Sequence, residues 1–274
     1  MRVNWNSEIL DALPGDLLQA QRACWYADGL FETLRMSNGA LPWLSDHWRR
    51  LRAGLEALEF ELPAHWDESF WAVEIKKIAS GNARIRWQVW RAPGGWYLPE
   101  SRKPVYLLTA EPLGNAWFTW QASGIRVGLA AGIRISSDAL SGFKGIDTTR
   151  YVAAALEAHR NGWDEAIVLN TADRVAEATS ANVFWWENDA LCTPPCSEGC
   201  VAGIARGRLI GAAKDSGYAV FEKSVTFAAL QAADEVFLTN AVRGIIPVAN
   251  LGGRALPAAK TKRLFECFTG SLAG

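Results

Sequence analysis

The chain has 274 residues, of which 50% are hydrophobic and 21% are charged, and its formal net charge at pH 7 is −1. This balance is typical of a globular protein with one large domain or two modest ones, and it excludes the strong basic field that attracts nucleic acid or an anionic membrane. The sequence has no run of about 18 apolar residues, which excludes a transmembrane helix of ordinary length.

The cysteines indicate a reducing compartment. Their number is odd and most have apolar or small neighbours, so we expect reduced thiols and a cytoplasmic location. Three of them form C-x3-C-x3-C, but this spacing matches no common zinc pattern, the intervening prolines would break a helix, and no His is nearby. We therefore expect small buried side chains there and no bound metal. The five residues are Cys24, Cys192, Cys196, Cys200 and Cys267.

Strand patterns alternate with helix patterns in the first half of the chain. Strands are predicted at the end of the segment 20–36, over 83–92 and over 104–110. In the second of these, Ile85, Trp87 and Val89 fall on one face and the arginines on the other, as strict alternation requires.

Two helices are predicted between these strands. The first begins at Leu44, with Ser45 as its capping residue. The second spans about 66–80 and would turn Phe70, Val73 and Ile78 toward the core.

A connection rich in Gly and Pro at 111–124 predicts two domains, 1–115 and 116–274. The second half carries a helix at 147–160, with Val152 and Leu156 on its apolar side, and a Gly-rich loop that enters a helix within 199–217. Further strands and short helices follow, and the segments 244–248 and 252–256 complete the chain. The alternation predicts a mixed α/β or α+β fold with two lobes.

Lys144 and Glu177 are the first candidates for chemistry. A helix–strand–turn unit lies between them in the sequence and could hold the two at a fixed separation. A lysine amine can form a Schiff base with the aldehyde of pyridoxal phosphate (PLP), and a carboxylate can pair with its protonated pyridine nitrogen. Taken alone, each residue also fits a solvated side chain on a loop or at a strand end.

An anion site is predicted at Gly203–Ala205, where a glycine precedes a helix and the first amides of the helix point outward. Arg50 could supply a fixed positive partner, although it also fits a solvated charged face. Asn240, after a strand, could place backbone donors at a second anion position, although it also fits an ordinary turn.

Eight segments together resemble the fold-type IV PLP enzymes, a family of branched-chain aminotransferases, D-amino-acid aminotransferases and 4-amino-4-deoxychorismate lyases. They occur in the family's order and cover nearly the whole chain. They are DGLFETLR (28–35), HWRRL (47–51), RIRWQVWRAPGG (84–95), the segment around Lys144, GWDEAIVLN (162–170), VAEATSANVF (175–184), TPPCSEGCVAGIAR (193–206) and DEVFLTNAVRGIIPV (234–248).

The resemblance implies a role for each matching residue. PLP would lie between the two lobes, with Lys144 as its Schiff-base lysine and Glu177 at its pyridine nitrogen. Arg50 and the amides of Ile204 and Ala205 would bind its phosphate. The remaining implied residues are Asn240, Ala241 and Val242 in the phosphate- and carboxylate-binding loop, Arg86 at the substrate carboxylate, and Arg35 and Arg91 at the border of that pocket.

Two departures from the family pattern concern the reaction type. Many relatives have Asn-Tyr three and four residues after the lysine, whereas this chain has Asp147 and Thr148, with Tyr151 a turn later. A Thr that is common in the phosphate loop of the transaminases is Ala241 here.

FETLR and LTNAVRGIIPV resemble the lyase branch, which implies conversion of 4-amino-4-deoxychorismate to 4-aminobenzoate and pyruvate for folate biosynthesis. The alternatives are an aminotransferase for branched-chain or D-amino acids with 2-oxoglutarate and a non-catalytic PLP-binding protein. A homodimer is implied as well.

Overall fold

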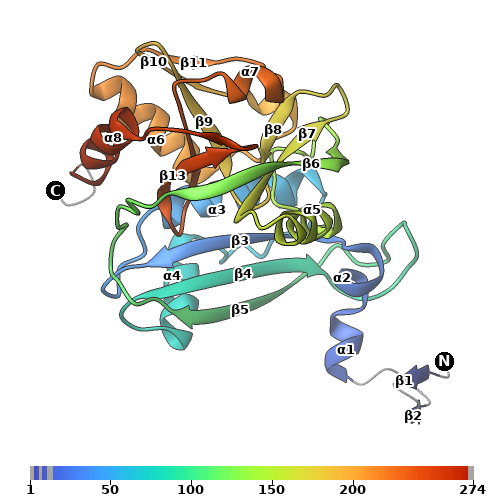
Figure 1. Cartoon of the computed structure of the whole chain (residues 1–274). Coiled ribbons are helices and arrows are strands. Elements are labelled where there is room, and N and C mark those ends of the chain that lie inside the picture. The colour runs from blue at the N-terminus through green and yellow to red at the C-terminus, as the bar shows by residue number, and fades with distance from the viewer. Residues whose placement is uncertain (1–2, 6–7, 11–14, 271–274) are drawn as a thin grey trace.

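The computed structural model describes residues 3–5, 8–10 and 15–270, which form two lobes (Figure 1). The first lobe is built on a three-stranded antiparallel sheet in the order β3-β4-β5. Its strands are β3 (Gly29–Met36), β4 (Ala83–Arg91) and β5 (Pro104–Pro112), and its helices are α1 (Gly15–Gln19), α2 (Gln21–Tyr26), α3 (Leu44–Ala57) and α4 (Glu68–Ile78). A hairpin of β1 (Val3–Trp5) and β2 (Glu8–Leu10) precedes them.

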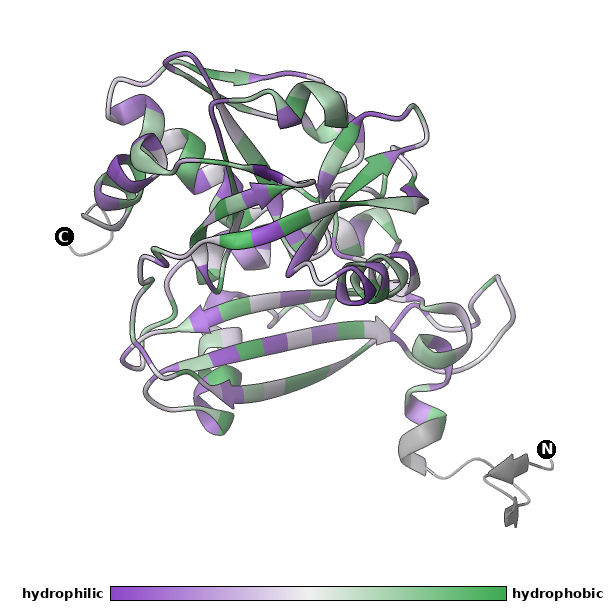
Figure 2. Cartoon of the chain, viewed as in Figure 1, coloured by the Kyte–Doolittle hydropathy of each residue, from purple (hydrophilic) through white to green (hydrophobic). Residues whose placement is uncertain are grey.

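The alternation predicted for β4 is confirmed. Ile85, Trp87 and Val89 are fully buried in the core of this lobe, and Figure 2 shows polar and apolar residues alternating along the strand. The apolar face predicted for α4 is wrong in part. The helix buries Trp71 and Ile75 instead, because the Trp71 side chain packs against Trp87, with 4.3 Å between the two ring centroids.

With this face of α4 toward the core, Val73 and Ile78, which were predicted to be buried, are exposed by 57% and 45%.

The start of α3 also differs from the prediction. The helix begins at Leu44 as expected, but its N-cap residue is Trp43, in the left-handed region at φ 65°, with no side-chain cap. Ser45 therefore lies inside the first turn.

The second lobe has a nine-stranded mixed sheet in the order β11-β10-β9-β12-β13-β6-β7-β8, with β14 paired to β13. Neighbours are antiparallel except for the pairs β6–β7, β6–β13 and β10–β11. The strands are β6 (Ile125–Ile135), β7 (Glu165–Asn170), β8 (Val175–Ala178), β9 (Asn182–Glu187), β10 (Ala190–Thr193), β11 (Val220–Glu222), β12 (Glu235–Asn240), β13 (Gly244–Leu251) and β14 (Arg254–Ala255). The mixed α/β prediction is thereby confirmed.

The helices of this lobe are α5 (Thr149–Arg160), α6 (Ile204–Asp215), α7 (Phe227–Gln231), α8 (Ala259–Gly270) and the 3-10 turn η1 (Cys196–Glu198). The apolar face predicted for α5 is wrong, because the helix buries Ala154 and Ala158 and leaves Val152 and Leu156 more than half exposed. Small alanines let α5 lie close to β6 and β7. Helix α8 was not predicted.

The lobes meet where the segment around Lys144 joins the free edge of β3. The Phe31 amide donates to the Lys144 carbonyl at 2.8 Å, and the Ile146 amide donates to the Gly29 carbonyl at 3.1 Å. The segment 113–124, between β5 and β6, has no helix or strand, and the domain boundary at 115/116 stays a prediction. Across the described ranges, no helix has the length and apolar character needed to cross a membrane.

Candidate active site

A cavity of about 1090 Å³ lies between the lobes. Most of the residues predicted from the sequence line it. These are Lys144, Glu177, Arg50, Ile204, Ala205, Asn240, Ala241, Val242, Arg86 and Arg91. Segments far apart in the chain therefore meet at one place.

Lys144 reaches this cavity from the segment pinned to β3. Its Nζ lies 4.6 Å from the centroid of the Phe31 ring. Within the described residues, that nitrogen has no hydrogen-bond or ion-pair partner. Burial lowers the pKa of the Lys144 amine, and the positive charge of Arg50 lowers it further. A larger fraction of the amine is therefore neutral, which is the form that acts as a nucleophile or base.

Glu177 faces the same cavity from β8, with only 4% of its surface exposed. Its Oε1 accepts a 2.6 Å bond from the Tyr151 hydroxyl, and its Oε2 accepts from the Val201 amide at 3.2 Å and from Asn182 Nδ2 at 3.4 Å. Burial raises the pKa of the carboxyl group to about 7, against the opposing effects of the Tyr151 bond and the Lys144 charge. Such a group can hold a proton or pair with a cation at neutral pH.

Arg50 is held from two sides. Its Nε donates to Glu32 Oε1 at 2.8 Å and its Nη2 to Glu32 Oε2 at 2.5 Å, while Nη1 donates to the Ala202 carbonyl at 2.8 Å. Ala202 directly precedes Gly203, so the arginine is tied to the start of α6. Neither Glu32 nor His47, whose Nδ1 lies 2.7 Å from Glu32 Oε2, was predicted as a site residue.

The start of α6 is an anion-binding geometry. Gly203 is its N-cap and lines the cavity with Ile204 and Ala205. The first amides of a helix have no partner within the helix, so they can donate to an anion, which the helix dipole also favours. A Cβ on Gly203 would lie 1.9 Å from Asn182 Oδ1, so this position has room only for glycine.

The β12–β13 turn brings Asn240, Ala241 and Val242 to the cavity. The Asn240 side chain organises the turn, because its Oδ1 accepts from the Val242 amide at 3.1 Å and from the Arg243 amide at 2.8 Å. The Val242 amide is therefore already bonded, which limits its use as a donor to a ligand.

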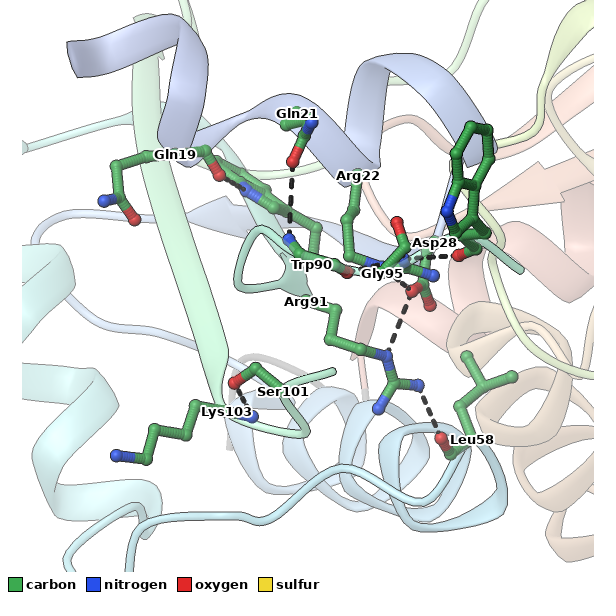
Figure 3. Close-up of polar contacts among 12 residues, drawn as sticks. Gln19, Gln21, Arg22, Asp28, Leu58, Trp90, Arg91, Gly95, Ser101 and Lys103 are labelled. Carbon is green, nitrogen blue, oxygen red and sulfur yellow. Dashed lines mark hydrogen bonds and ion pairs between the residues drawn. The ribbon is translucent and has the colours of Figure 1, made fainter. Parts of the chain in front are cut away.

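The three predicted substrate arginines differ in their surroundings. The Arg86 guanidinium lies 4.1 Å from the centroid of Phe31 and has no carboxylate partner among the described residues. Arg91 lines the cavity but is bound to Asp28 at 3.0 Å and to the Leu58 carbonyl at 2.6 Å (Figure 3). Arg35 is not among the lining residues. It is buried and donates to backbone carbonyls, including that of Val242 at 2.7 Å.

The residues that follow the cysteine cluster provide backbone groups to this site, namely the Val201 amide, which donates to Glu177, and the Ala202 carbonyl, which accepts from Arg50. Cys192 and Cys200 are buried and all five cysteines are free thiols. Among the described residues, no group of three or more His, Cys, Asp or Glu side chains could hold a metal ion.

Comparison with known proteins places this geometry in a family. A family model described as amino-transferase class IV matches residues 29–251. The chain is 29% identical to the provisionally named branched-chain-amino-acid aminotransferase of Methanocaldococcus jannaschii, over 98% of this chain and 95% of that protein. It is 28% identical to the aminodeoxychorismate lyase of Vibrio harveyi, over 84% of this chain and 85% of that protein.

Among solved structures, the 4-amino-4-deoxychorismate lyase of Pseudomonas aeruginosa matches with a TM-score of 0.82 and 27% identity, over 96% of this chain and 97% of that one. The resemblance seen in the sequence is thereby confirmed. Both lyases and aminotransferases occur among the similar proteins at nearly equal identity.

Proposed function

The chain belongs to the class IV aminotransferase family of PLP-dependent enzymes, and on this premise we propose that it is a lyase that converts 4-amino-4-deoxychorismate to 4-aminobenzoate and pyruvate. This reaction would serve folate biosynthesis. The observation that carries the proposal is the charge of the cavity. The substrate has two carboxylates, one on the ring and one on the enolpyruvyl group, so it needs more than one cationic contact.

The arginines of the cavity separate into two groups by their partners. Four have a carboxylate counter-ion: Arg22 and Arg91 share Asp28, Arg50 binds Glu32, and Arg84 binds Glu111. The other three, which are Arg86, Arg150 and Arg243, have no carboxylate within ion-pair distance among the described residues. Three guanidinium groups without a carboxylate partner suit a dianionic substrate such as 4-amino-4-deoxychorismate better than an amino acid with one carboxylate. The 2-oxoglutarate of an aminotransferase is a dianion as well, so the keto-acid dependence of turnover decides between the two reactions.

The residues present fit PLP. Lys144 presents an amine without a partner, Glu177 is a buried carboxylate with a raised pKa, and α6 presents its amides beside Arg50. We assign Lys144 to the aldehyde, Glu177 to the pyridine nitrogen, and Arg50 with Ile204 and Ala205 to the phosphate. When bound, PLP supplies the electron sink that stabilises negative charge on the substrate carbon.

Lys144 would act as the base of the reaction. Its lowered pKa leaves a neutral amine that can remove the proton from the ring carbon bearing the substrate amine. The bond between the neighbouring carbon and the enolpyruvyl oxygen then breaks, its electron pair leaves with the oxygen, and the ring becomes aromatic. Lys144 would return its proton to the departing enolate, which gives pyruvate and leaves the amine neutral. Arg86 would hold a carboxylate, and its position against the face of Phe31 fixes the guanidinium.

An aminotransferase for branched-chain or D-amino acids with 2-oxoglutarate is the second candidate. Apolar side chains of the cavity favour it, namely Leu30, Phe31, Ile135, Leu140 and Val152. Such a lining suits an aliphatic side chain. The same base and the same carboxylate contact would serve either reaction.

Pyruvate release from 4-amino-4-deoxychorismate in the absence of any keto acid tests the proposal. The lyase proceeds without a co-substrate, and pyruvate forms in equal amount to 4-aminobenzoate. Strict dependence of turnover on 2-oxoglutarate would instead establish the aminotransferase. Lys144→Ala should remove the visible absorption band of the purified holoenzyme, and its survival would contradict the assignment of the lysine.

We also propose a homodimer. The loop 92–103 exposes Trp96, Tyr97 and Leu98 by 81%, 90% and 84%. Arg22 holds the base of this loop, donating to the Gly94 and Trp96 carbonyls at 3.0 and 2.7 Å, while its Nε pairs with Asp28 (Figure 3). A rigid, exposed apolar loop favours burial against a second copy of the chain.

Light scattering tests the dimer, and a monomer at micromolar concentration would contradict it. We propose a cytoplasmic location as well, since the cysteines are all unpaired.

A further inference from the structure

We propose that Glu32 is a positioning residue that orients Arg50 toward the cofactor phosphate. Glu32 accepts hydrogen bonds along one edge of the Arg50 guanidinium, and the N–H groups that remain can donate to the phosphate. The inference rests on the proposed placement of that phosphate at Arg50 and the start of α6. It concerns a residue that neither the sequence patterns nor the family resemblance singled out for a role.

The hydrogen bonds of Arg50 define which donors are left. Glu32 takes Nε and Nη2 in a bidentate contact, at 2.8 and 2.5 Å, and the Ala202 carbonyl takes one N–H of Nη1 at 2.8 Å. A guanidinium has five N–H bonds in a rigid plane. One N–H on Nη1 and one on Nη2 therefore stay free, and their direction is fixed by the two contacts already made.

Glu32 is itself fixed. It is 1% exposed on β3, and His47 on α3 places Nδ1 2.7 Å from Oε2, so the carboxylate is held from two positions of one helix. Burial alone would raise the pKa of Glu32, but the charges and hydrogen bonds of Arg50 and His47 outweigh it and hold the pKa at about 2. The carboxylate is therefore ionised wherever the enzyme works.

Two roles of Glu32 predict opposite effects on the cofactor. If the residue orients Arg50, its loss weakens phosphate binding, because a long side chain must then be ordered by the ligand. If it only offsets the charge of Arg50, its loss strengthens phosphate binding. Water in this large cavity would screen the repulsion between the Glu32 charge and the phosphate. The short hydrogen bonds that orient Arg50 depend much less on such screening. Orientation therefore dominates.

The test compares the binding of PLP and of pyridoxal, which lacks the phosphate, to purified apoprotein by fluorescence. Both aldehydes react with Lys144, so their ratio isolates the phosphate. In E32Q, we expect the Kd for PLP to rise about 10-fold to 100-fold, as for the loss of a charged hydrogen bond. The Kd for pyridoxal should change less than about 3-fold, since no phosphate contact is involved.

E235Q is the matched control. Glu235 is 3% exposed and accepts from the Lys260 and Thr261 amides and the Thr261 hydroxyl, at the start of α8. The substitution removes an equally buried carboxylate from a different place. It should leave the ratio of the two dissociation constants as in the wild type. E32D keeps the charge with a shorter reach, and it should lower the preference for PLP as well.

Three results would overturn the inference: equal losses for both ligands in E32Q, tighter binding of PLP in E32Q, or an E32D variant that binds like the wild type. R50A separates these failures from failure of the proposed phosphate site. If R50A leaves the ratio unchanged, the phosphate is not at Arg50 and the placement itself is wrong. If R50A lowers the preference for PLP while E32Q does not, only the role of Glu32 is wrong.

Discussion

The Tyr151 hydroxyl donates a 2.6 Å hydrogen bond to Glu177 Oε1. This contact concerns the departure from the family pattern in the residues that follow Lys144. Where many relatives place a Tyr four residues after the lysine, this chain has Thr148, and its tyrosine comes one turn later on α5. There it contacts the carboxylate assigned to the pyridine nitrogen. The tyrosine thus holds the carboxylate that we propose as the partner of the cofactor.

Tyr151→Phe should lower kcat/KM about 10-fold, the usual effect of losing a hydrogen bond to a charged group. The Tyr151 bond lowers the pKa of Glu177, so its removal raises that pKa. As the pH falls, the Glu177 carboxylate of the variant is then protonated at a higher pH than in the wild type. The acidic limb of the pH–rate profile should therefore move to higher pH. Profiles of both enzymes test this.

Tyr106→Phe serves as the control for that experiment. Its hydroxyl also donates to a glutamate, Glu74 Oε2 at 3.0 Å, but far from the cavity. It should leave the pH–rate profile in place. An unmoved acidic limb in Tyr151→Phe would mean that the tyrosine does not act on Glu177.

Glu177→Gln should stabilise the apoprotein while reducing activity. The folded protein raises the pKa of this carboxyl from 4.5 to about 7, so the native state binds the proton more tightly than the unfolded chain. The free energy of unfolding therefore falls as pH rises between these values. At about 1.4 kcal/mol for each pKa unit, the variant should exceed the wild type by up to about 3 kcal/mol at pH 8.

Urea denaturation of the two apoproteins at pH 5 and pH 8 measures this difference. The two curves should converge toward the acidic end, where the glutamate is protonated. A variant that is less stable than the wild type at pH 8 would show that the ionised carboxylate is stabilised by its three donors. Activity should fall at least about 100-fold, because a neutral amide cannot retain the proton on the pyridine nitrogen.

The sequence was a sound guide to the strands and to which residues line the cavity, and a poor guide to which side chains contact one another. Lys144, Glu177 and Arg50 could be predicted because each lies in a segment with its own pattern. Glu32 and Tyr151 could not, since their partners are 18 and 26 residues away and meet them only in the folded chain.

The predictions of which helix face is buried were wrong for a related reason. In α4 and α5 more than one stripe of residues is apolar, and which stripe is buried depends on packing against other elements. In α4 the contact between Trp71 and Trp87 determines the buried face, and in α5 the packing of small alanines against the sheet determines it. The sequence of α8 does carry apolar residues at helical spacing, and Leu264, Phe265 and Phe268 are all buried in the structure.

Arg86→Ala should raise KM for the substrate about 10-fold to 100-fold, as expected for a lost charge-assisted contact with a carboxylate. The cofactor absorption band should be unchanged. Arg84→Ala is the control, because Arg84 shares that face of β4 but pairs with Glu111 at 2.8 Å. Equal effects of both substitutions would mean that the cavity acts through its overall charge rather than through Arg86.

Gly203→Ala should weaken the binding of PLP about 10-fold and destabilise the fold by roughly 1–3 kcal/mol, the usual cost of overpacking. Gly203 has φ −61°, so its backbone would accept alanine. The obstacle is space, since the new Cβ would lie 1.9 Å from Asn182 Oδ1. Asn182 donates to the Val201 carbonyl at 2.9 Å and to Glu177, so moving it disturbs both ends of the cofactor site.

Gly207→Ala, one turn along α6, is the control that distinguishes the steric effect of a new methyl group from the effect of alanine on helix stability. A Cβ there meets no atom within 4 Å, and replacing an exposed glycine inside a helix stabilises by about 0.5–1 kcal/mol. Thermal melts should therefore show a lower Tm for Gly203→Ala and a higher Tm for Gly207→Ala, and fluorescence titration should show weaker PLP binding only for Gly203→Ala. If Gly203→Ala binds PLP as tightly as Gly207→Ala, the start of α6 is not the phosphate site, because a methyl group that displaces Asn182 could not leave that contact intact.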